Sequence, residues 1–506
     1  MRGSLLVAGT TSDAGKTVVT TALCRAFARR GVRVAPFKAQ NMSNNSMVCL
    51  AADGRAAEIG RAQWSQALAA QAVPEPAMNP VLLKPGSDRR SHVVVMGQPA
   101  GELRAADFLG GRTALRDAAF AAYDDLAGRY DVVVAEGAGS PTEINLRAGD
   151  FVNMGLARHG RIPTVVVGDI DRGGVFAAMF GTLALLDAAD QALVAGWIVN
   201  KFRGDVGLLA PGLDRLRGLT GRPVHGVLPW HPDLWLDSED ALDLGGRRAD
   251  DRGRGPTLRV AVVRLPRISN FTDVDALGLE PSVDVVFAAE PRALAGADVV
   301  VLPGTRATLA DLAWLRDRGL DRAVVQHAAA GRAVLGICGG FQMLGRTVSD
   351  PDGVEGPAGA EVPGLGLLDV ATVFEPAKVL ALPSGSALGA PVRGYEIHHG
   401  RVTRGPGAGE FPGGAADGAV AGTMWHGSLE SDGFRQAWLG LAAATAGTSY
   451  SQSGVSFAER REARFELLAD LAEEHLDVDA LLDLALSGPP AGLPVLPPGP
   501  DRRESR

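Results

Sequence analysis

The sequence Gly9-Thr10-Thr11-Ser12-Asp13-Ala14-Gly15-Lys16-Thr17 follows an apolar run at residues 5–8 and leads into residues with helical spacing. A strand, a loop bounded by glycines, Gly-Lys-Thr and a helix are together typical of a P-loop, whose backbone N–H groups bind phosphate. The loop has five residues between its glycines, whereas the common pattern has four. Lys16 would add positive charge at the phosphates, and the Thr17 hydroxyl can bind Mg²⁺. The pattern therefore predicts a nucleotide-binding domain at the start of the chain.

The length and composition of the chain limit its class. At 506 residues it is too long for one ordinary hydrophobic core, so two or more domains are expected. Its net charge of -8 argues against nucleic acid as the main partner, and no apolar run approaches the roughly 18 residues that a membrane span needs. The first strand starts too early to leave room for a signal peptide. The three cysteines, Cys24, Cys49 and Cys338, lack metal-ligand spacing and suit a reducing compartment, so we expect a cytoplasmic protein.

Polar residues gather after the second predicted strand. Residues 32–37 lead into Lys38-Ala-Gln-Asn-Met-Ser-Asn-Asn-Ser46, and ligands of a parallel sheet bind at the carboxyl ends of its strands. A solvated Asn/Ser turn is an equally good interpretation of this composition. Arg61 follows further along the chain, and Lys84 lies beside a further break in regular structure. Any of these charges could instead lie on a solvated face. Of these charged residues, Lys38 and Lys84 are the stronger candidates for a binding site, because each lies beside a break in regular structure.

Two later strands deliver candidate ligands. The unbroken apolar run at residues 131–135 predicts a buried parallel strand that ends at Glu136. A carboxylate there can hold Mg²⁺ directly or through water, whereas the alternative role is a capping or turn acid. Asp53 is a second candidate metal ligand. The strand at residues 194–199 is followed by Asn200-Lys201, which can offer an amide to the edge of adenine and a lysine stem to its face.

The alternation of strands and helices predicts an α/β fold with a doubly wound parallel sheet over residues 1–237. Residues 238–257, rich in Asp, Arg and Gly, are expected to form a linker. A second α/β domain is expected over residues 258–487, with closing helices from residue 455. The Pro-rich and charged residues 488–506 predict a disordered tail.

A cysteine in the second half lies between a strand and a helix, in Gly336-Ile-Cys338-Gly-Gly340. Gly-x-Cys-x-Gly is the cysteine form of a nucleophile elbow, in which a sharp turn exposes the side chain and a helix N-terminus lowers the thiol pKa. A base for this thiol is available at His398-His399 or at His426. Adjacent histidines on a strand face opposite ways, so at most one could serve, and the strand-end position favours His426. Pro303-Gly304-Thr305 forms a turn that can present backbone N–H groups.

These motifs resemble known families. The P-loop resembles that of dethiobiotin synthetase-like ligases, and the cysteine elbow, Gly304 turn and His426 resemble triad-type glutamine amidotransferases. The two joined in this order are similar to the cobyrinic acid amidases, and most similar among them to the cobyric acid synthase family. The segments that carry this resemblance are Ala35-Pro-Phe-Lys-Ala-Gln-Asn-Met42, Glu58-Ile-Gly-Arg-Ala-Gln63, Met78-Asn-Pro-Val-Leu-Leu-Lys-Pro85, Glu136-Gly-Ala-Gly-Ser-Pro-Thr-Glu-Ile-Asn145 and Gly394-Tyr-Glu-Ile-His398.

The resemblance implies ATP- and Mg²⁺-dependent amidation of the b, d, e and g side-chain carboxylates of (adenosyl)cobyrinic acid a,c-diamide, a corrinoid of cobalamin biosynthesis. The reaction would run through acyl phosphates, with glutamine as the ammonia donor. Cys338 would attack glutamine, His426 would move protons, and the Gly304 N–H would help to form the oxyanion hole. ATP would be bound by Thr10, Asp13, Gly15, Lys16, Thr17, Asn200 and Lys201, and the metal by Thr17, Glu136 and Asp53. The corrinoid would be bound by Lys38, Gln40, Asn41, Asn44, Arg61, Lys84 and Asn145.

One departure leaves the third member of the triad open. Many triad amidotransferases carry His-Pro-Glu, whereas this chain has His426-Gly427-Ser428. The site could work as a Cys–His dyad, and Glu430, although close in sequence, is not assigned.

Other functions compete with this interpretation. The nearest is the related a,c-diamide synthase, or another ligase–amidotransferase that acts on a different acid. A partitioning-type regulatory ATPase would carry an extra lysine at the position of Thr11, and a binding module would use Cys338 only structurally. The sequence leaves open the order of the amidations, the corrin's upper ligand, the path of ammonia and the existence of a homo-oligomer.

Overall fold

The computed structural model describes residues 2–87, 90–104, 112–232 and 257–496. The chain divides into two compact units. Unit 1 consists of Met1–Met42, Cys49–Asp237 and Arg461–Arg506, and unit 2 consists of Ser43–Val48 and Ser238–Arg460. The predicted linker lies outside the described residues, apart from its last residue.

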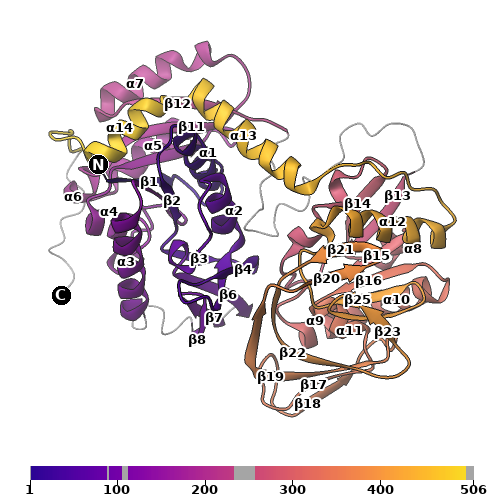
Figure 1. Cartoon of the computed structure of the whole chain (residues 1–506). Helices are drawn as coiled ribbons and strands as arrows, with labels where there is room; N and C mark the ends of the chain where they lie inside the picture. Colours follow the sequence, from indigo (N-terminus) through magenta and orange to yellow (C-terminus); the bar gives the residue numbers. More distant parts are fainter. Residues whose placement is uncertain (1, 88–89, 105–111, 233–256, 497–506) are drawn as a thin grey trace. The chain divides into compact units, whose positions relative to one another are not determined.

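Unit 1 is built on a six-stranded parallel sheet with the order β12-β11-β10-β1-β9-β2 (Figure 1). The central strands are buried along almost their whole length, as expected of a parallel sheet covered on both faces. The order reverses at β1, which lies between β9 and β10, and ligands bind outside the strand ends at such a point. The strands are β1 (Gly3–Gly9), β2 (Val34–Phe37), β9 (Val132–Glu136), β10 (Thr164–Asp169), β11 (Val194–Phe202) and β12 (Val224–Pro229).

The helix α1 (Lys16–Arg29) begins directly after the P-loop and buries Val19, Leu23 and Phe27 in the core of unit 1. Cys24 is buried in the same core, as the helical spacing predicts, and burial raises its pKa well above the usual range. The other helices before the linker are α2 (Arg61–Ala69), α3 (Arg112–Arg129), α4 (Met154–Gly160), α5 (Val175–Ala184), α6 (Ala188–Gln191) and α7 (Ala210–Thr220).

Smaller strands follow β2. A four-stranded sheet has the order β3-β6-β7-β8, with β3 (Gln40–Met42), β6 (Val81–Ser87), β7 (Arg90–Val95) and β8 (Gln98–Arg104). The strand β4 (Ser46–Leu50) includes the boundary between the two units, and β5 (Ala56–Gly60) precedes α2. The polar segment after β2, for which a solvated turn was one of two interpretations, therefore includes a strand, β3, and the start of another.

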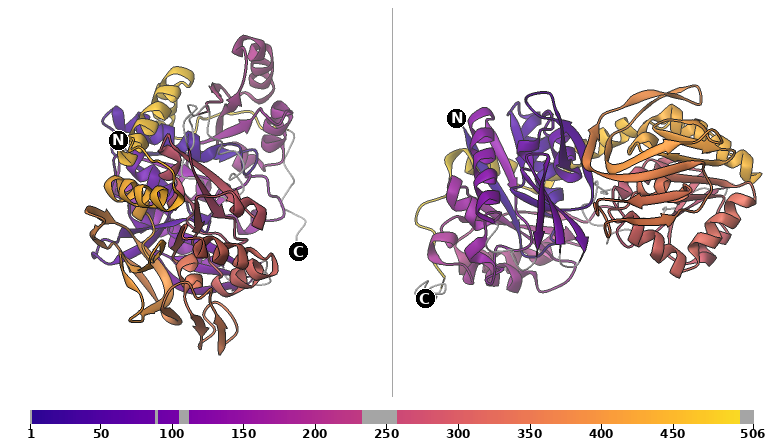
Figure 2. Two further views of the ribbon diagram at one scale, coloured as in Figure 1. Left: turned by 90° about the vertical axis from the view of Figure 1, so that its right-hand side faces the viewer. Right: turned by 90° about the horizontal axis from the view of Figure 1, so that it is seen from below.

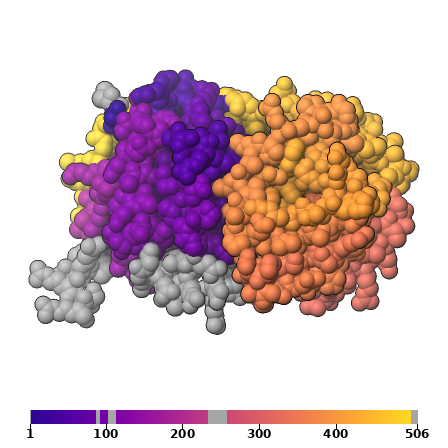
Figure 3. All heavy atoms as spheres, turned by 60° about the horizontal axis from the view of Figure 1, so that its bottom comes forward, coloured from indigo at the N-terminus to yellow at the C-terminus, as the bar shows by residue number. Residues whose placement is uncertain are grey.

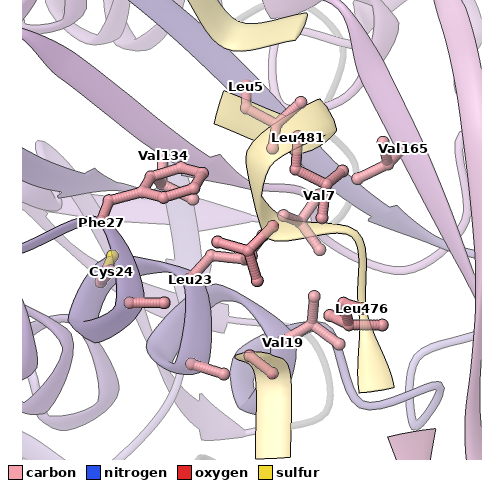
Figure 4. Packing of buried hydrophobic residues seen from close by; sticks show 14 of the residues in the cluster. Leu5, Val7, Val19, Leu23, Cys24, Phe27, Val134, Val165, Leu476 and Leu481 are labelled. Atoms are coloured by element: carbon pink, nitrogen blue, oxygen red, sulfur yellow. The ribbon is translucent and has the colours of Figure 1, made fainter. Parts of the chain in front are cut away.

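The last two helices correct the predicted domain boundary. From Arg461 onward, α13 (Phe457–His475) and α14 (Val478–Ser487) belong to unit 1, not to the second domain. Figures 1 and 2 show these yellow helices beside the indigo elements of unit 1, and Figure 3 shows yellow atoms against its indigo and purple atoms. The physical reason is apolar burial, because Leu476 and Leu481 pack with residues of β1 and α1 in one core (Figure 4).

Part of the predicted tail is also ordered against unit 1. The carbonyl oxygen of Pro494 accepts a hydrogen bond from the buried Arg222 guanidinium, and the Leu496 N–H donates to Gln191 Oε1 at 2.9 Å. The expectation of disorder is therefore wrong for residues 488–496, because these backbone groups satisfy buried polar side chains. Residues 497–506 lie outside the described residues.

Unit 2 contains a seven-stranded sheet with the order β14-β13-β15-β16-β25-β24-β23, whose first five strands are parallel. These strands are β13 (Leu258–Val263), β14 (Val283–Ala288), β15 (Val299–Leu302), β16 (Ala333–Ile337), β23 (Gly409–Phe411), β24 (Gly414–Asp417) and β25 (Val420–Thr423). A second sheet has the order β18-β17-β19-β22, with β17 (Thr347–Asp350), β18 (Ala360–Pro363), β19 (Val370–Ala381) and β22 (Glu396–Arg404). The strands β20 (Ser384–Ala387) and β21 (Ala390–Arg393) form a hairpin.

The helices of unit 2 are α8 (Pro291–Ala295), α9 (Thr308–Asp317), α10 (Leu320–Ala329), α11 (Gly339–Leu344) and α12 (Asp432–Ala446). The prediction of a P-loop α/β domain followed by a second α/β domain is thus confirmed. None of the described helices is both long enough and apolar enough to cross a membrane.

Candidate active sites

The P-loop of unit 1 connects β1 to α1 at the carboxyl edge of the sheet. Gly15 precedes α1 with φ 94°, a conformation that favours glycine, and a Cβ added there would lie 2.0 Å from Asn200 Nδ2. That amide donates to the Ala14 carbonyl oxygen at 3.0 Å. Asn200 therefore supports the loop from within β11, which runs to Phe202, whereas the predicted strand ended at residue 199.

Lys16 is nearly buried, and its ammonium group is held by three backbone carbonyls. It donates to Thr11 O and Ser12 O, each at 2.9 Å, and to Gly139 O at 3.2 Å. Because Gly139 lies in the loop after β9, this contact joins the P-loop to the next strand end. The charge is thereby fixed at the phosphate-binding turn.

Glu136 is the meeting point of the side chains at this edge. It is 1 % exposed, and its Oε1 accepts hydrogen bonds from Thr17 Oγ1 at 2.9 Å and from Lys38 Nζ at 3.0 Å. Its Oε2 accepts from Gln66 Nε2 at 2.6 Å. The structure thus brings together Thr17, Lys38 and Glu136. Sequence reasoning missed Gln66, because α2 buries several polar residues and nothing in its pattern singles this one out.

The donor set around Glu136 fits Mg²⁺. Neighbouring oxygens of an octahedral Mg²⁺ site, each about 2.0–2.1 Å from the ion, lie about 2.9 Å apart. Thr17 Oγ1 and Glu136 Oε1 have that separation. Among the residues that the structure describes, no three His, Cys, Asp or Glu side chains gather as a metal site. These two oxygens would therefore share the ion with phosphate oxygens and water.

Asp53 is not brought to this cluster. It lies in an exposed turn, and its described contacts are to Arg55, which donates from its backbone N–H at 3.0 Å and from Nε at 2.6 Å. The backbone hydrogen bond and then the guanidinium lower the pKa of Asp53. The two predicted metal ligands at the P-loop, Thr17 and Glu136, are in contact, whereas the third is not among their partners.

The remaining predicted ATP-binding residues lie close to the P-loop. Lys201 Nζ donates to Asp13 O at 2.7 Å and to Asp169 Oδ2 at 2.9 Å, and Arg172 donates to Asp13 Oδ2 at 2.8 Å. The Thr10 N–H donates to Val167 O at 2.9 Å. The strands β10 and β11 therefore brace the loop through side chains at their ends.

The predicted corrinoid-binding residues fall into two groups. Most are buried in unit 1 and already make internal contacts: Asn41 Nδ2 donates to Gln63 Oε1 at 3.0 Å, Lys84 Nζ donates to Glu58 Oε1 at 2.5 Å, and Arg61 lies over the Trp64 ring. Gln40 is also buried, whereas Asn145 is exposed and Asn44 falls in the short segment assigned to unit 2.

Cys338 of unit 2 lies at a sharp turn between β16 and α11. Its backbone has φ 50° and ψ −108°, a strained conformation for a residue with a side chain. A Cβ added at Gly340 would lie 2.0 Å from Leu302 O, and one added at Gly336 would lie 2.6 Å from Phe341 Cα. The flanking glycines therefore permit the turn, which has the geometry of a nucleophile elbow.

His426 lies beside Cys338 and is 1 % exposed. Its Nδ1 lies 2.7 Å from Asp273 Oδ2, and the Cys338 side chain is close enough to act on the pKa of the imidazole. Burial lowers the pKa of His426, but the charges of Asp273 and Cys338 outweigh this effect and raise the pKa to about 10. The Asp273 carboxylate therefore favours the protonated form of the imidazole.

The alternative histidines have other partners. His398 Nδ1 donates to Gly400 O at 2.8 Å, and His399 Nδ1 donates to Glu375 O at 3.1 Å. Burial, with the positive charges of Arg306 and Lys378, lowers the pKa of His399 to about 4. Of the three histidines, His426 is the one in contact with Cys338.

Asp273 was missed because it precedes His426 by 153 residues. It lies in the short helix η6 (Phe271–Val274), and its Oδ1 also accepts the Gly427 N–H at 2.8 Å. The sequence offered only its position in a polar stretch after β13 as a signal. Residues close to His426 in sequence include the carboxylate of Glu430 but not that of Asp273.

Gly304 borders the same site. A Cβ added at Gly304 would lie 2.8 Å from His426 Cε1, and one added at Gly339 would lie 2.6 Å from Thr305 Cγ2. The backbone of the Gly304 turn therefore lies against both the imidazole and the first residue after Cys338. This is where a second backbone donor would be needed for an oxyanion hole.

Comparisons with known proteins match both units. Residues 5–243 match the CobQ/CobB/MinD/ParA nucleotide binding domain family, and residues 259–434 match the CobB/CobQ-like glutamine amidotransferase domain family. Among solved structures, one of a glutamine amidotransferase aligns with 37% of this chain and 99% of its own length, at 19% identity and a TM-score of 0.30.

Curated relatives match over nearly the full length. A protein named cobyric acid synthase from Mycolicibacterium gilvum (strain PYR-GCK) is 72% identical over 495 residues, which cover 98% of this chain and 99% of the relative. The protein of the same name from Mycobacterium tuberculosis (strain ATCC 25177 / H37Ra) is 70% identical over 501 residues, with 98% and 99% covered.

Proposed function

We propose a reaction for this chain on the premise that it belongs to the cobyric acid synthase family and is a glutamine-dependent carbon–nitrogen ligase. In this reaction the b, d, e and g carboxylates of a cobyrinic acid a,c-diamide corrinoid become amides, with consumption of ATP and glutamine. The observation that carries the proposal is the presence on one chain of a phosphate-binding loop in contact with Glu136 and a cysteine elbow in contact with His426. We place the enzyme in the cytoplasm, where free cysteines stay reduced.

The chemistry explains why both sites are needed. A carboxylate resists attack by ammonia because oxide is a poor leaving group. In unit 1 a carboxylate oxygen of the corrinoid would attack the γ-phosphorus of ATP, releasing ADP and forming an acyl phosphate. Ammonia would then attack the acyl carbon, and phosphate would leave. Lys16 is held where it can balance the charge that develops on the phosphate oxygens.

Mg²⁺ held by Thr17 and Glu136 would supply further positive charge at the phosphates. The carboxylate of Glu136 must be oriented for this task. Gln66 and Lys38 orient it by donating hydrogen bonds to its Oε2 and Oε1, respectively. Lys38 is buried with Glu136 as a partner, which holds its ammonium group at the same edge of the sheet.

Ammonia would be produced in unit 2. The Cys338 sulfur would attack the amide carbon of glutamine, and the negative charge of the tetrahedral intermediate would fall on the former carbonyl oxygen. The backbone N–H groups of Gly304 and Gly339 are the proposed donors to that oxygen. The carbon–nitrogen bond would break as His426 gives its proton to the leaving nitrogen. Water deprotonated by His426 would then cleave the thioester to glutamate.

Product analysis tests the proposal. The full chain is incubated with the a,c-diamide corrinoid, ATP, Mg²⁺ and glutamine, and the corrinoid is examined by mass spectrometry. Four successive carboxylate-to-amide changes are expected, with loss of all four when ATP is omitted. Amidation of cobyrinic acid at positions a and c instead would favour the a,c-diamide synthase alternative. Failure to amidate either corrinoid would contradict the proposed substrate class.

A further inference from the structure

We propose that Asp273 is the acid partner of His426 and completes a Cys338–His426–Asp273 triad, an inference that rests on the proposed role of Cys338 as the glutamine nucleophile. Asp273 is a positioning residue, since it contacts the histidine and not the sulfur. It takes the place of the acid that triad amidotransferases carry two residues after the histidine, where this chain has Ser428.

The carboxylate of Asp273 is held at two points. Its Oδ2 accepts from His426 Nδ1 at 2.7 Å, and its Oδ1 accepts from the Gly427 N–H at 2.8 Å. The side chains of His426 and Asp273 are only 1 % and 3 % exposed. Because Nδ1 must carry a proton to make this bond, the other ring nitrogen, Nε2, is left for the sulfur. The contact therefore fixes both the tautomer and the plane of the imidazole.

The position of Asp273 depends on its own buried neighbours. Phe271 and Val274 of η6 are 1 % and 2 % exposed, so the short helix is anchored on both sides of the aspartate. Asn270, which begins this turn with φ 50°, accepts the Ser46 N–H on its Oδ1 at 2.9 Å. The acid is thus held rigidly by a segment far upstream of the histidine. The backbone N–H of Glu430, the nearer carboxylate in sequence, donates to Gly427 O at 3.0 Å.

The charged and titratable groups that face His426 predict a pH effect. These are Asp273 on η6, Cys338 at the elbow and Tyr395 directly before β22, whose ring stacks on the imidazole at 5.3 Å between centroids. The carboxylate stabilises the imidazolium, and the imidazolium stabilises the thiolate. Loss of the negative charge at residue 273 should therefore lower the pKa of His426 and weaken the stabilisation of the thiolate by the imidazolium.

The test compares Asp273→Asn with Glu430→Gln in the full chain. The Asn variant should lose roughly 10²- to 10⁴-fold in glutaminase kcat, as in other triads whose acid is removed. Its rate of alkylation by iodoacetamide should rise with pH as for an ordinary thiol, whereas the wild-type rate should stay high at neutral pH. Cys24 and Cys49 are buried with raised pKa values, so alkylation, located by peptide mapping, should report Cys338. The Gln variant should match the wild type in both measurements.

The outcomes separate this inference from the proposed function. Ammonia-dependent amidation by Asp273→Asn should remain near the wild-type rate, which also shows that the variant is folded. If that variant does not fold, Asp273→Glu keeps the charge and should retain the wild-type pH profile with a reduced kcat. Wild-type glutaminase activity and pH profile in Asp273→Asn, or a large loss in Glu430→Gln alone, would overturn the role of Asp273. A glutaminase that survives Cys338→Ser would instead overturn the nucleophile itself.

Discussion

Among single residues, Glu136 carries the most chemistry in unit 1 because Thr17, Lys38 and Gln66 all converge on its two oxygens. Glu136→Gln keeps the shape but removes the charge that would bind Mg²⁺. The Mg²⁺ concentration for half-maximal amidation should rise by at least about tenfold, with little change in corrinoid binding. A Mg²⁺ titration of the ammonia-dependent reaction measures this effect, and an unchanged curve would count against the metal role.

The same substitution has a cost in stability. It leaves the Lys38 ammonium buried without its counter-charge, so the variant should unfold at lower urea concentration than the wild type. Pairing it with Lys38→Met removes the unpaired charge. Recovery of stability without recovery of Mg²⁺-dependent activity would separate the two roles of the carboxylate.

Lys16 tests whether activation of the acid comes before nitrogen transfer. Lys16→Ala removes the charge that three loop carbonyls hold at the phosphate-binding turn. Amidation should fall on the order of a hundredfold or more with glutamine and with free ammonia alike. Glutaminase activity of unit 2 serves as the internal control. Substantial ammonia-driven product from this variant would contradict the P-loop assignment.

Cys338 tests the opposite division of labour. Cys338→Ser should abolish glutamine-dependent amidation, because a serine hydroxyl at neutral pH is a far weaker nucleophile than a thiolate. High ammonium at mildly alkaline pH should restore the product, and His426→Ala should behave in the same way. His399→Ala is the matched control and should keep its glutaminase activity, since that ring bonds to Glu375 O. Loss of both nitrogen sources in a folded, ATP-binding Cys338→Ser variant would exclude the two-site mechanism.

At the scale of elements, the turn from β16 into α11 depends on close backbone packing. A Cβ at position 340 would lie 2.0 Å from Leu302 O, and a backbone atom cannot move aside as a side-chain tip can. Gly340→Ala should therefore destabilise unit 2 by about 1–3 kcal/mol and abolish glutaminase activity. Gly440 in α12 has open space around it, so Gly440→Ala should be neutral or stabilising by about 0.5–1 kcal/mol. Urea unfolding of the two variants measures the difference, and equal effects would contradict the packing argument.

At the scale of the whole molecule, the end of the chain completes the core in which its beginning is buried. Leu481 of α14 is fully buried in the cluster that contains Leu5 and Leu23 (Figure 4). Leu481→Ala should destabilise unit 1 by about 2–5 kcal/mol and weaken ATP binding through the P-loop helix. Leu441→Ala is the control, because that leucine is 54% exposed. If both leucine variants unfold at the same urea concentration, α14 is not part of this core.

Ion pairs also join α13 to α1. Arg25 of α1 is fully buried and pairs with Glu462 and Glu466 of α13, and Arg29 pairs with Asp470 at 2.7 Å. A buried guanidinium left without these carboxylates would be costly. Removal of α13 and α14 should therefore lower the stability of unit 1 more than that of unit 2.

Local patterns by themselves determined much of this protein. The P-loop, the buried strand that ends at Glu136 and the cysteine elbow are encoded by residues adjacent in sequence, because each is one strand, one turn and one helix. Their spacing was sufficient to predict an α/β fold with two chemical sites. The sequence placed Lys38 and Glu136 at strand ends, but their contact with each other was not predicted, because they lie 98 residues apart.

Only the tertiary structure decided which distant residues complete these sites and cores. Asp273 reaches His426 across 153 residues, and Gln66 reaches Glu136 across 70, so no local spacing relates them. The helices after residue 460 read as the close of the second domain because they follow it in the chain. They belong to unit 1 because its sheet and α1 present the apolar surface that their own apolar faces must bury. Periodicity shows that a helix has an apolar face, whereas the partner of that face is set by packing in three dimensions.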